Sequence, residues 1–204
     1  MAQGNSSTKA ALGQRRQELA LYRQVLPSLE LKRQQLLADR HRELQCLEAA
    51  REQLAKLSRE AGQRFPMLAS AGASLAGIVR IERIETRERL VVGTSVPVLE
   101  EVHWSKVEYG LLATPHWFDE AIELIRRMAR QRLEVSLALE RIRRIDRAIR
   151  IVVQRINLFE QVLIPRAKSE IQRIRIVLSD AERAAVVRSK IFKLRHERTR
   201  EMPT

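Results

Sequence analysis

Apolar residues recur at steps of three and four along the first sixty residues, the spacing of a helix that buries one stripe of its surface. The stripe runs through Leu12, Leu19, Tyr22, Leu26, Leu29 and Leu36, and resumes at Leu44, Leu47, Leu54, Leu57 and Ala61. We interpret the interval between Leu36 and Leu44 as a stutter, a change of phase that locally unwinds a left-handed supercoil. The pattern predicts a long helix that needs a helical partner.

A second stripe follows late in the chain, through Leu139, Ile142, Ile149, Val152, Ile156, Phe159, Leu163, Ala167, Ile171, Ile174, Leu178, Ala181 and Ala185. About fifty residues separate the two arms, so the chain can turn back and pair them antiparallel in an elongated rod. At about 1.5 Å per residue the arms span roughly 85 Å and roughly 130 Å. From about residue 176 onward the second arm should lack a partner helix. The apolar groups that then need other cover are Val177, Leu178, Val186, Val187, Ile191 and Phe192.

Glycine divides the chain into three segments, because it is costly inside a helix and marks turns instead. No glycine occurs in residues 14–61 or 111–204, and five of the seven fall between these stretches. We expect an amino-terminal coiled-coil helix over 1–65, a middle segment over 66–114 and a long carboxy-terminal coiled-coil helix over 115–204. The predicted fold class is all-α: a long antiparallel two-helix coiled coil with a short irregular or β-hairpin middle.

The middle segment supports two interpretations. Part of "IVRIERIETRERLVV" alternates apolar and charged residues, and "GTSVP" supplies turn residues, with Pro97 suited to a strand edge. This predicts a short hairpin, although "RIERIETRERL" fits a helix equally well by its charges. The helix then restarts where Thr114 provides a cap, Pro115 fits the first turn, and Asp119 and Glu120 face the positive helix end.

The composition excludes several classes of protein. Only 4% of the residues are aromatic while 31% are charged, which argues against a thick globular core. The single cysteine, Cys46, rules out an internal disulfide or a CxxC motif, and we expect a buried thiol. The longest uncharged stretch, 65–79, is shorter than the roughly 18–20 residues that cross a bilayer. We expect a cytoplasmic protein without a membrane-spanning helix.

The chain shows no recognisable catalytic or cofactor motif. The dipeptide Gly-Lys never occurs, so the phosphate-binding P-loop pattern is missing. The four histidines are scattered without metal-ligand spacing, at positions 41, 103, 116 and 196. We therefore expect a protein that is not an enzyme and that has no catalytic, cofactor or metal residues.

The net charge of +13 is concentrated on the helical arms. Lys and Arg exceed Asp and Glu by 12 to 7 in residues 1–65 and by 21 to 12 in 115–204, whereas residues 66–114 hold 5 against 6. Three explanations fit: a solvated coiled-coil face, a nucleic-acid-binding surface, or a basic axle inside a protein sleeve of complementary potential. The cations are interleaved with acids and lack aromatic stacking platforms, which weakens the nucleic-acid explanation.

Three stretches resemble the family of D subunits of V-type (A/V-type) ATPases and ATP synthases. One has the order R-x-N-x-x-E-x-x-x-I-P, at Arg155, Asn157, Glu160, Ile164 and Pro165. A second carries Glu182, Arg183, Arg188, Lys190 and Lys193, and the third carries Leu29, Lys32, Arg33 and Leu36. The resemblance covers about residues 7–195.

The resemblance implies a non-catalytic central-stalk rotor subunit that transmits torque between ATP turnover and ion translocation. Its terminal helices would insert into a hexamer of catalytic A and non-catalytic B subunits. Its lower part would bind the small F subunit, and its base would seat on the subunit called C or d above the membrane ring. The protein would thus be peripheral to a membrane. The alternative function is a basic coiled-coil nucleic-acid-binding or scaffold protein.

The resemblance also suggests which residues contact the hexamer. The candidates are Arg166, Lys168, Arg173, Arg183, Arg188, Lys190, Phe192 and Lys193. Pro165 lies inside the second arm, where a proline removes a backbone hydrogen bond and bends the helix. We hypothesise that this bend makes the shaft asymmetric; a tolerated kink without a mechanical role is the alternative.

Overall fold

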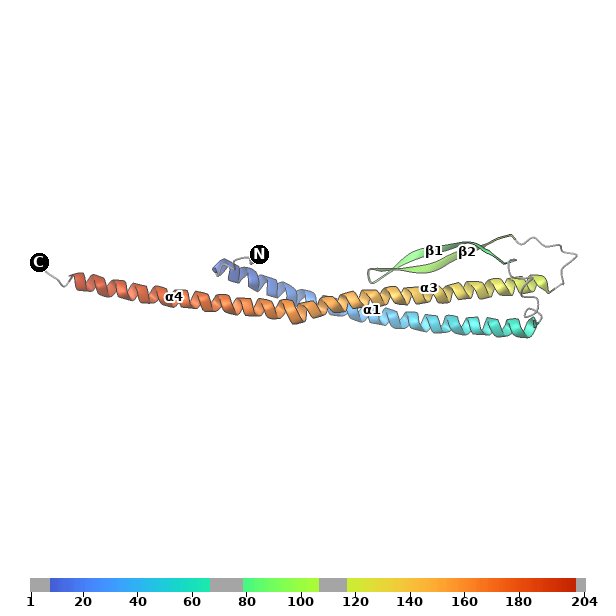
Figure 1. The fold of residues 1–204 in the computed structure, drawn as a ribbon, viewed down its shortest axis with the longest axis horizontal. Coiled ribbons are helices and arrows are strands. Elements are labelled where there is room, and N and C mark those ends of the chain that lie inside the picture. The colour runs from blue at the N-terminus through green and yellow to red at the C-terminus, as the bar shows by residue number, and fades with distance from the viewer. Residues whose placement is uncertain (1–7, 67–78, 107–116, 201–204) are drawn as a thin grey trace. The chain divides into compact units, whose positions relative to one another are not determined.

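The computed structural model describes residues 8–66, 79–106 and 117–200, with side chains as far as residue 194. Its elements are α1 (Lys9–Arg64), β1 (Ile81–Val91), β2 (Thr94–Trp104), α3 (Phe118–Asn157), the π-helix η1 (Leu158–Leu163) and α4 (Ile164–Arg200) (Figure 1). The chain divides into two compact units. Unit 1 comprises residues 1–31 and 153–204, and unit 2 comprises residues 32–152. The predicted all-α fold with a small hairpin is confirmed.

Unit 2 contains an antiparallel helix pair. Side-chain contacts between α1 and α3 run in opposite directions along the two helices: Arg40 bonds Asp146, whereas Arg64 bonds Glu120. Small apolar clusters lie between them, one of Leu47, Ala138 and Ile142 and one of Phe65, Ala121 and Leu124. The core is thus a thin seam, as the low aromatic content predicted.

Unit 1 contains a second antiparallel pair, formed by the start of α1 with η1 and α4. The ring of Tyr22 meets Phe159 edge-on at 5.5 Å between centroids. Further out, Arg15 bonds Glu170 at 2.9 Å and Lys9 bonds Glu182 at 3.7 Å. The two arm stripes therefore face each other within each unit, although Ala181 and Ala185 at the end of the second stripe are exposed.

The predicted stutter in α1 is wrong. Leu36 and Leu47 are buried and Glu43 is buried between them, while Arg40 is half-buried. These four positions continue one unbroken heptad spacing. The apolar pattern concealed this continuity, because two seam positions are occupied by charged residues that α3 and the hairpin neutralise.

The phase change occurs in the second arm instead. Its seam takes three successive steps of four residues from Phe159 to Ile171, one residue more than a heptad repeat allows. η1 absorbs the extra residue in a π-helical turn, where the amide of Ile164 donates to the carbonyl of Phe159. Pro165 comes next, as the second residue of α4. The proline therefore follows a widened turn and does not interrupt regular α-helix.

The middle segment forms the predicted hairpin, which decides against a helix over 80–90. β1 and β2 pair antiparallel through a two-residue loop of Val92 and Gly93, both with positive φ (48° and 76°), the sign pattern of a type I′ turn. β2 buries Val96, Leu99 and Val102, whereas most of β1 is exposed. The hairpin therefore presents one covered and one open strand.

Two local predictions can be compared directly with the structure. Asp119 and Glu120 lie in the first turn of α3, as expected, while Thr114 and Pro115 lie outside the described residues. Cys46 is exposed, so the predicted buried thiol is wrong. The seam passes through Glu43 and Leu47, which turns the intervening Cys46 outward.

Replacing Leu36 by alanine should strongly destabilise the helix pair. Leu36 is completely buried, and such truncations cost about 2–5 kcal/mol of unfolding free energy. The matched control is its neighbour Leu37→Ala, at a side chain that is 46% exposed, which should cost less than about 1 kcal/mol. Urea unfolding followed by circular dichroism measures both. Equal losses would contradict the seam.

Replacing Val92 by asparagine should stabilise the hairpin. A β-branched residue at φ 48° is strained, while Asn-Gly is the favoured pair for this turn. Removing this backbone strain should raise the stability of the folded hairpin by about 1 kcal/mol. The stabilisation should appear as slower amide hydrogen exchange in residues 81–104. The control is Gly93→Ala, which should speed exchange because Gly93 also needs its positive φ. Faster exchange in Val92→Asn would count against the turn geometry.

Deleting Gln161 together with Pro165→Ala should convert the π-helical turn to regular α-helix, because the seam then returns to heptad phase. Pro165→Ala alone should retain the π turn, since the extra residue remains. Crystal structures of the two variants, supported by slower hydrogen exchange across residues 155–170 in the deletion, measure the difference. If Pro165→Ala alone restores α-helix, the proline and not the extra residue causes the turn.

Candidate partner-binding surface

The eight residues predicted to contact a partner all lie on α4, and all are exposed. Arg166, Lys168 and Arg173 lie along the part of α4 that packs on α1, whereas the other five lie beyond Glu182. The second group consists of Arg183, Arg188, Lys190, Phe192 and Lys193. The structure therefore separates the candidates into a paired and a projecting set.

The paired set lies on the flanks of the buried seam. Ala167, Ile171 and Ile174 are buried, so the intervening cations point outward. Arg166 is bonded to Glu170 at 3.2 Å, and Glu170 also accepts from Arg15. These contacts neutralise part of the local charge.

A basic groove that sequence reasoning missed lies beside the paired set. Arg16 and Arg23 of α1 line it together with Lys168 and Arg175 of α4 and the apolar Leu19. Only Lys168 was singled out from the sequence. The sequence shows the excess of arginine on both arms, but only the pairing of α1 with α4 brings these four cations together.

The projecting set begins later than predicted. Thr8 caps α1, its hydroxyl accepting from the amide of Ala11 at 3.2 Å, so the helix already begins at Lys9. Lys9 in the first turn of α1 bonds Glu182 of α4 at 3.7 Å, and Leu178 is half-buried. The predicted limit near residue 176 is therefore wrong by about two turns of helix.

Beyond Glu182 the described side chains of α4 are all exposed as far as residue 194. The large apolar residues among them are Val186, Val187, Ile191, Phe192 and Leu194, with Phe192 72% exposed. They alternate along the helix with the cations of the projecting set. An apolar surface of this kind on a charged helix is typical of a site that another molecule covers.

Three potential metal ligands meet on the hairpin, although the sequence suggested none. Ligand atoms of Glu85, Glu101 and His103 lie within 4.8 Å of one another. Arg83 already bonds Glu85 at 3.2 Å, and His103 lies 3.4 Å from the same carboxylate oxygen. Arg83 on the same strand and His103 on β2 therefore already occupy the Glu85 carboxylate, and these contacts explain the grouping without a metal ion.

Within the described part of the chain, no helix has both the length and the apolar character needed to cross a bilayer.

Comparison with known proteins identifies the family. The profile of the ATP synthase D subunit family matches residues 11–194. The V-type ATP synthase D subunit of Borreliella burgdorferi is 31% identical over 186 residues, which are 91% of this chain and 92% of the relative. Those of Chlamydia abortus (31%; 95% and 94% covered) and Chlamydia muridarum (30%; 95% and 97% covered) are similar over nearly their full lengths. The chain therefore belongs to the ATP synthase D subunit family, as the resemblance in its sequence predicted.

Proposed function

We propose that the chain is the central-stalk rotor subunit of a V-type rotary ATPase or ATP synthase. In this role it is not an enzyme itself: it transmits torque between ATP turnover in a hexamer of A and B subunits and ion translocation in a membrane ring. Family membership over residues 11–194 supports the assignment to the complex. The paired helices within each unit supply elements suited to a shaft.

The observation that carries the proposal is the projecting end of α4. Its apolar side chains need a cover that the described part of α1 does not supply beyond Glu182. A ring of subunits with a polar lining would cover Phe192 and its apolar neighbours while facing Arg183, Arg188, Lys190 and Lys193. Burial of apolar area would hold the tip, and complementary charge would select the partner.

The remaining partners follow from the same assignment. The small F subunit would bind lower on the shaft, and the base would seat on the C or d subunit above the membrane ring. The chain would thus sit at the cytoplasmic side, peripheral to the membrane.

Pro165 contributes to the proposed mechanism through the turn that precedes it. A π-helical turn and a proline are both recognised causes of bending in helices. The π-helical turn at η1 and the proline at the start of α4 lie next to each other, so a bend in this stretch would make the shaft asymmetric. A shaft that bends there would present different surfaces to the three catalytic interfaces around it.

A nucleic-acid-binding coiled coil is the second candidate, and the basic groove beside Lys168 favours it. Binding of this kind would weaken steeply with salt, because each phosphate contact releases a counterion. Tight, salt-sensitive binding of duplex DNA without association with an A/B hexamer would contradict the rotor proposal.

Deleting residues 186–204 should weaken seating in the hexamer by at least tenfold, since about 1.4 kcal/mol suffices for that factor and several apolar side chains are lost. Binding of the F subunit should persist, because its contacts lie lower on the shaft. The ratio of ions transported to ATP hydrolysed should fall. Binding to the hexamer, binding of the F subunit and the ratio of ions transported to ATP hydrolysed are all measured in the reconstituted complex. A truncated shaft that binds and couples normally would show that this tip is only a solvated end.

A charge-matched pair of variants refines the test. Arg183→Glu with Arg188→Glu should weaken hexamer binding, while Arg51→Glu with Arg59→Glu makes the same change of net charge on exposed α1 positions. The control should bind the hexamer as the unchanged chain does. Equal loss in both would mean that net charge, and not the α4 tip, directs assembly.

A further inference from the structure

Two charged residues are buried in the described part of the chain, and they bond each other. Glu43 is 7% exposed and Arg141 is 8% exposed, and Nε of Arg141 donates to Oε2 of Glu43 at 2.7 Å. The second carboxylate oxygen accepts from Nη2 of Arg89, also at 2.7 Å. Buried ion pairs are often no more stable than apolar replacements of the same volume. Their presence in a seam therefore calls for an explanation other than stability.

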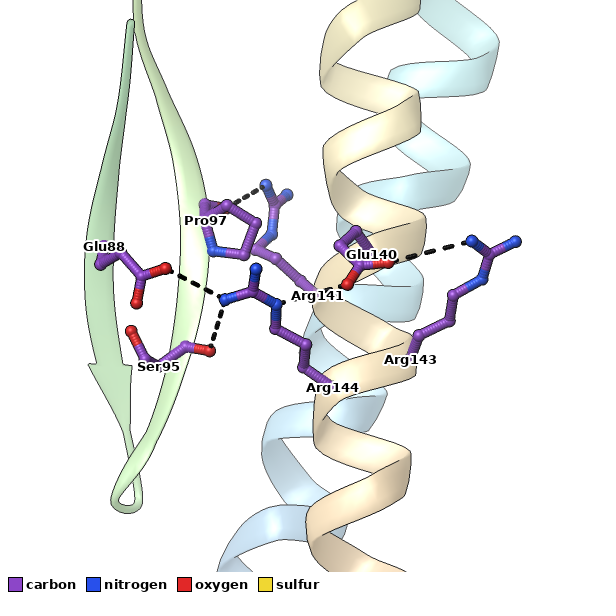
Figure 2. A network of polar contacts seen from close by, with 7 residues as sticks. All are labelled: Glu88, Ser95, Pro97, Glu140, Arg141, Arg143 and Arg144. Carbon is purple, nitrogen blue, oxygen red and sulfur yellow. Dashed lines mark hydrogen bonds and ion pairs between the residues drawn. The ribbon is translucent and has the colours of Figure 1, made fainter.

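The ion cluster joins the four described elements of unit 2. Glu43 lies on α1, Arg141 on α3 and Arg89 on β1, and Arg141 also donates to the carbonyl of Pro97 on β2 at 3.3 Å. Figure 2 shows this contact beside Arg144, which reaches from α3 to the carboxylate of Glu88 and the carbonyl of Ser95 on the hairpin.

A second pair lies one helical turn away. Arg40 occupies the seam position before Glu43 and donates to Asp146 of α3 at 2.6 Å. The two pairs thus connect α1 and α3 at adjacent layers of the same seam. A shift of α1 along α3 would therefore break both pairs together.

We infer that these two pairs are a register pin: Glu43–Arg141 and Arg40–Asp146 allow one alignment of α1 on α3 and exclude its neighbours. The inference concerns the chain by itself and goes beyond the proposed function. A shaft under torque would benefit from helices that cannot slide, but the pin does not depend on that use.

The apolar seam alone does not select the register. Leu47 packs against Ala138, and a shift of one heptad would bring it to Ile145, another apolar seam residue. Apolar contacts are non-directional, so a heptad shift preserves much of their free energy. An antiparallel coiled coil of this composition therefore needs a polar device to choose between registers.

The charged positions penalise both shifted registers. With the shift that brings Leu47 to Ile145, Glu43 moves from Arg141 to Ala148, which offers no charge. With the opposite shift Glu43 meets Glu134, a like charge. Glu43 would then lose its partner on α3 or lie beside another carboxylate, and either change is unfavourable for a buried charge.

The residues that would face Arg40 favour the same register. The first shift carries it from Asp146 to Val153, and the opposite shift carries it to Leu139. Neither side chain can accept a hydrogen bond from a guanidinium. Two separate ion pairs thus fail in each shifted register. The apolar seam tolerates the first shift, which brings Leu47 to Ile145, whereas the opposite shift brings Leu47 to the polar Gln131.

Disulfide trapping in the full chain tests the pin. In a Cys46→Ser background, Leu47→Cys with Ala138→Cys reports the native register, and Leu47→Cys with Ile145→Cys reports the register shifted by one heptad. The pin is removed by leucine at Arg40, Glu43, Arg141 and Asp146 together. Mild oxidation, followed by electrophoresis without reductant, measures the yield of each crosslink.

With the pin intact, only the native crosslink should form. Without it, the shifted crosslink should rise from background to a yield comparable with the native one, while the helical circular dichroism signal persists. The control replaces Glu48 and Arg51, an exposed pair within α1, by leucine and should give the native crosslink alone. A helical pin-free variant that forms only the native crosslink would overturn the inference.

A second variant tests the inference even if the fourfold leucine variant does not fold. Glu43→Gln and Asp146→Asn together with Arg40→Met and Arg141→Met remove the charges of both pairs with little change of volume, and this variant should also produce the shifted crosslink. If this variant is helical and crosslinks only in the native register, the inference is equally overturned. Both readouts use the isolated chain, so failure of the rotor proposal would leave the result unaffected.

Discussion

The structure depends on one constraint: an apolar stripe with three- and four-residue spacing can be buried only against another stripe that keeps the same phase. α1 maintains its heptad from Leu12 to Ala61 without interruption. The second arm carries one residue too many between Phe159 and Ile171, and remaining in contact with α1 requires a local change of helix geometry. The π-helical turn at Leu158–Leu163 is that change. The proline that seemed out of place at position 165 follows directly from it.

Charge has two different roles along these helices. In unit 2, Glu43 and Arg141 are buried and satisfied at 2.7 Å, and they connect the hairpin to both helices. On the projecting end of α4 the cations are exposed and alternate with apolar groups. Buried pairs restrict the structure to one arrangement, because their loss is costly, whereas exposed cations leave the helix free to select a partner by potential.

Arg144 provides polar contacts between α3 and the hairpin. Hydrogen bonds from this side chain to Glu88 and then Glu140 raise the pKa of Arg144 above its ordinary value. The guanidinium thus adds a polar attachment to the apolar side of β2, where Val96, Leu99 and Val102 are buried. Attachment of this kind is directional and complements the non-directional seam.

The sequence by itself determined the two helical arms, the family and the exposed character of the α4 tip, because each rests on local periodicity or on motif spacing. It left residues 80–90 open between a strand and a helix, and the pairing of β1 with β2 decided for the hairpin. It did not reveal that Arg40 and Glu43 are seam residues, since a charge in the seam is recognisable only when its partner more than ninety residues away is known. It also placed the phase change in the wrong arm and the end of helix pairing about two turns too early. The exposure of Cys46, the register of the arms and the grouping of cations beside Lys168 were decided by tertiary structure, because each depends on which face of a helix meets another chain segment.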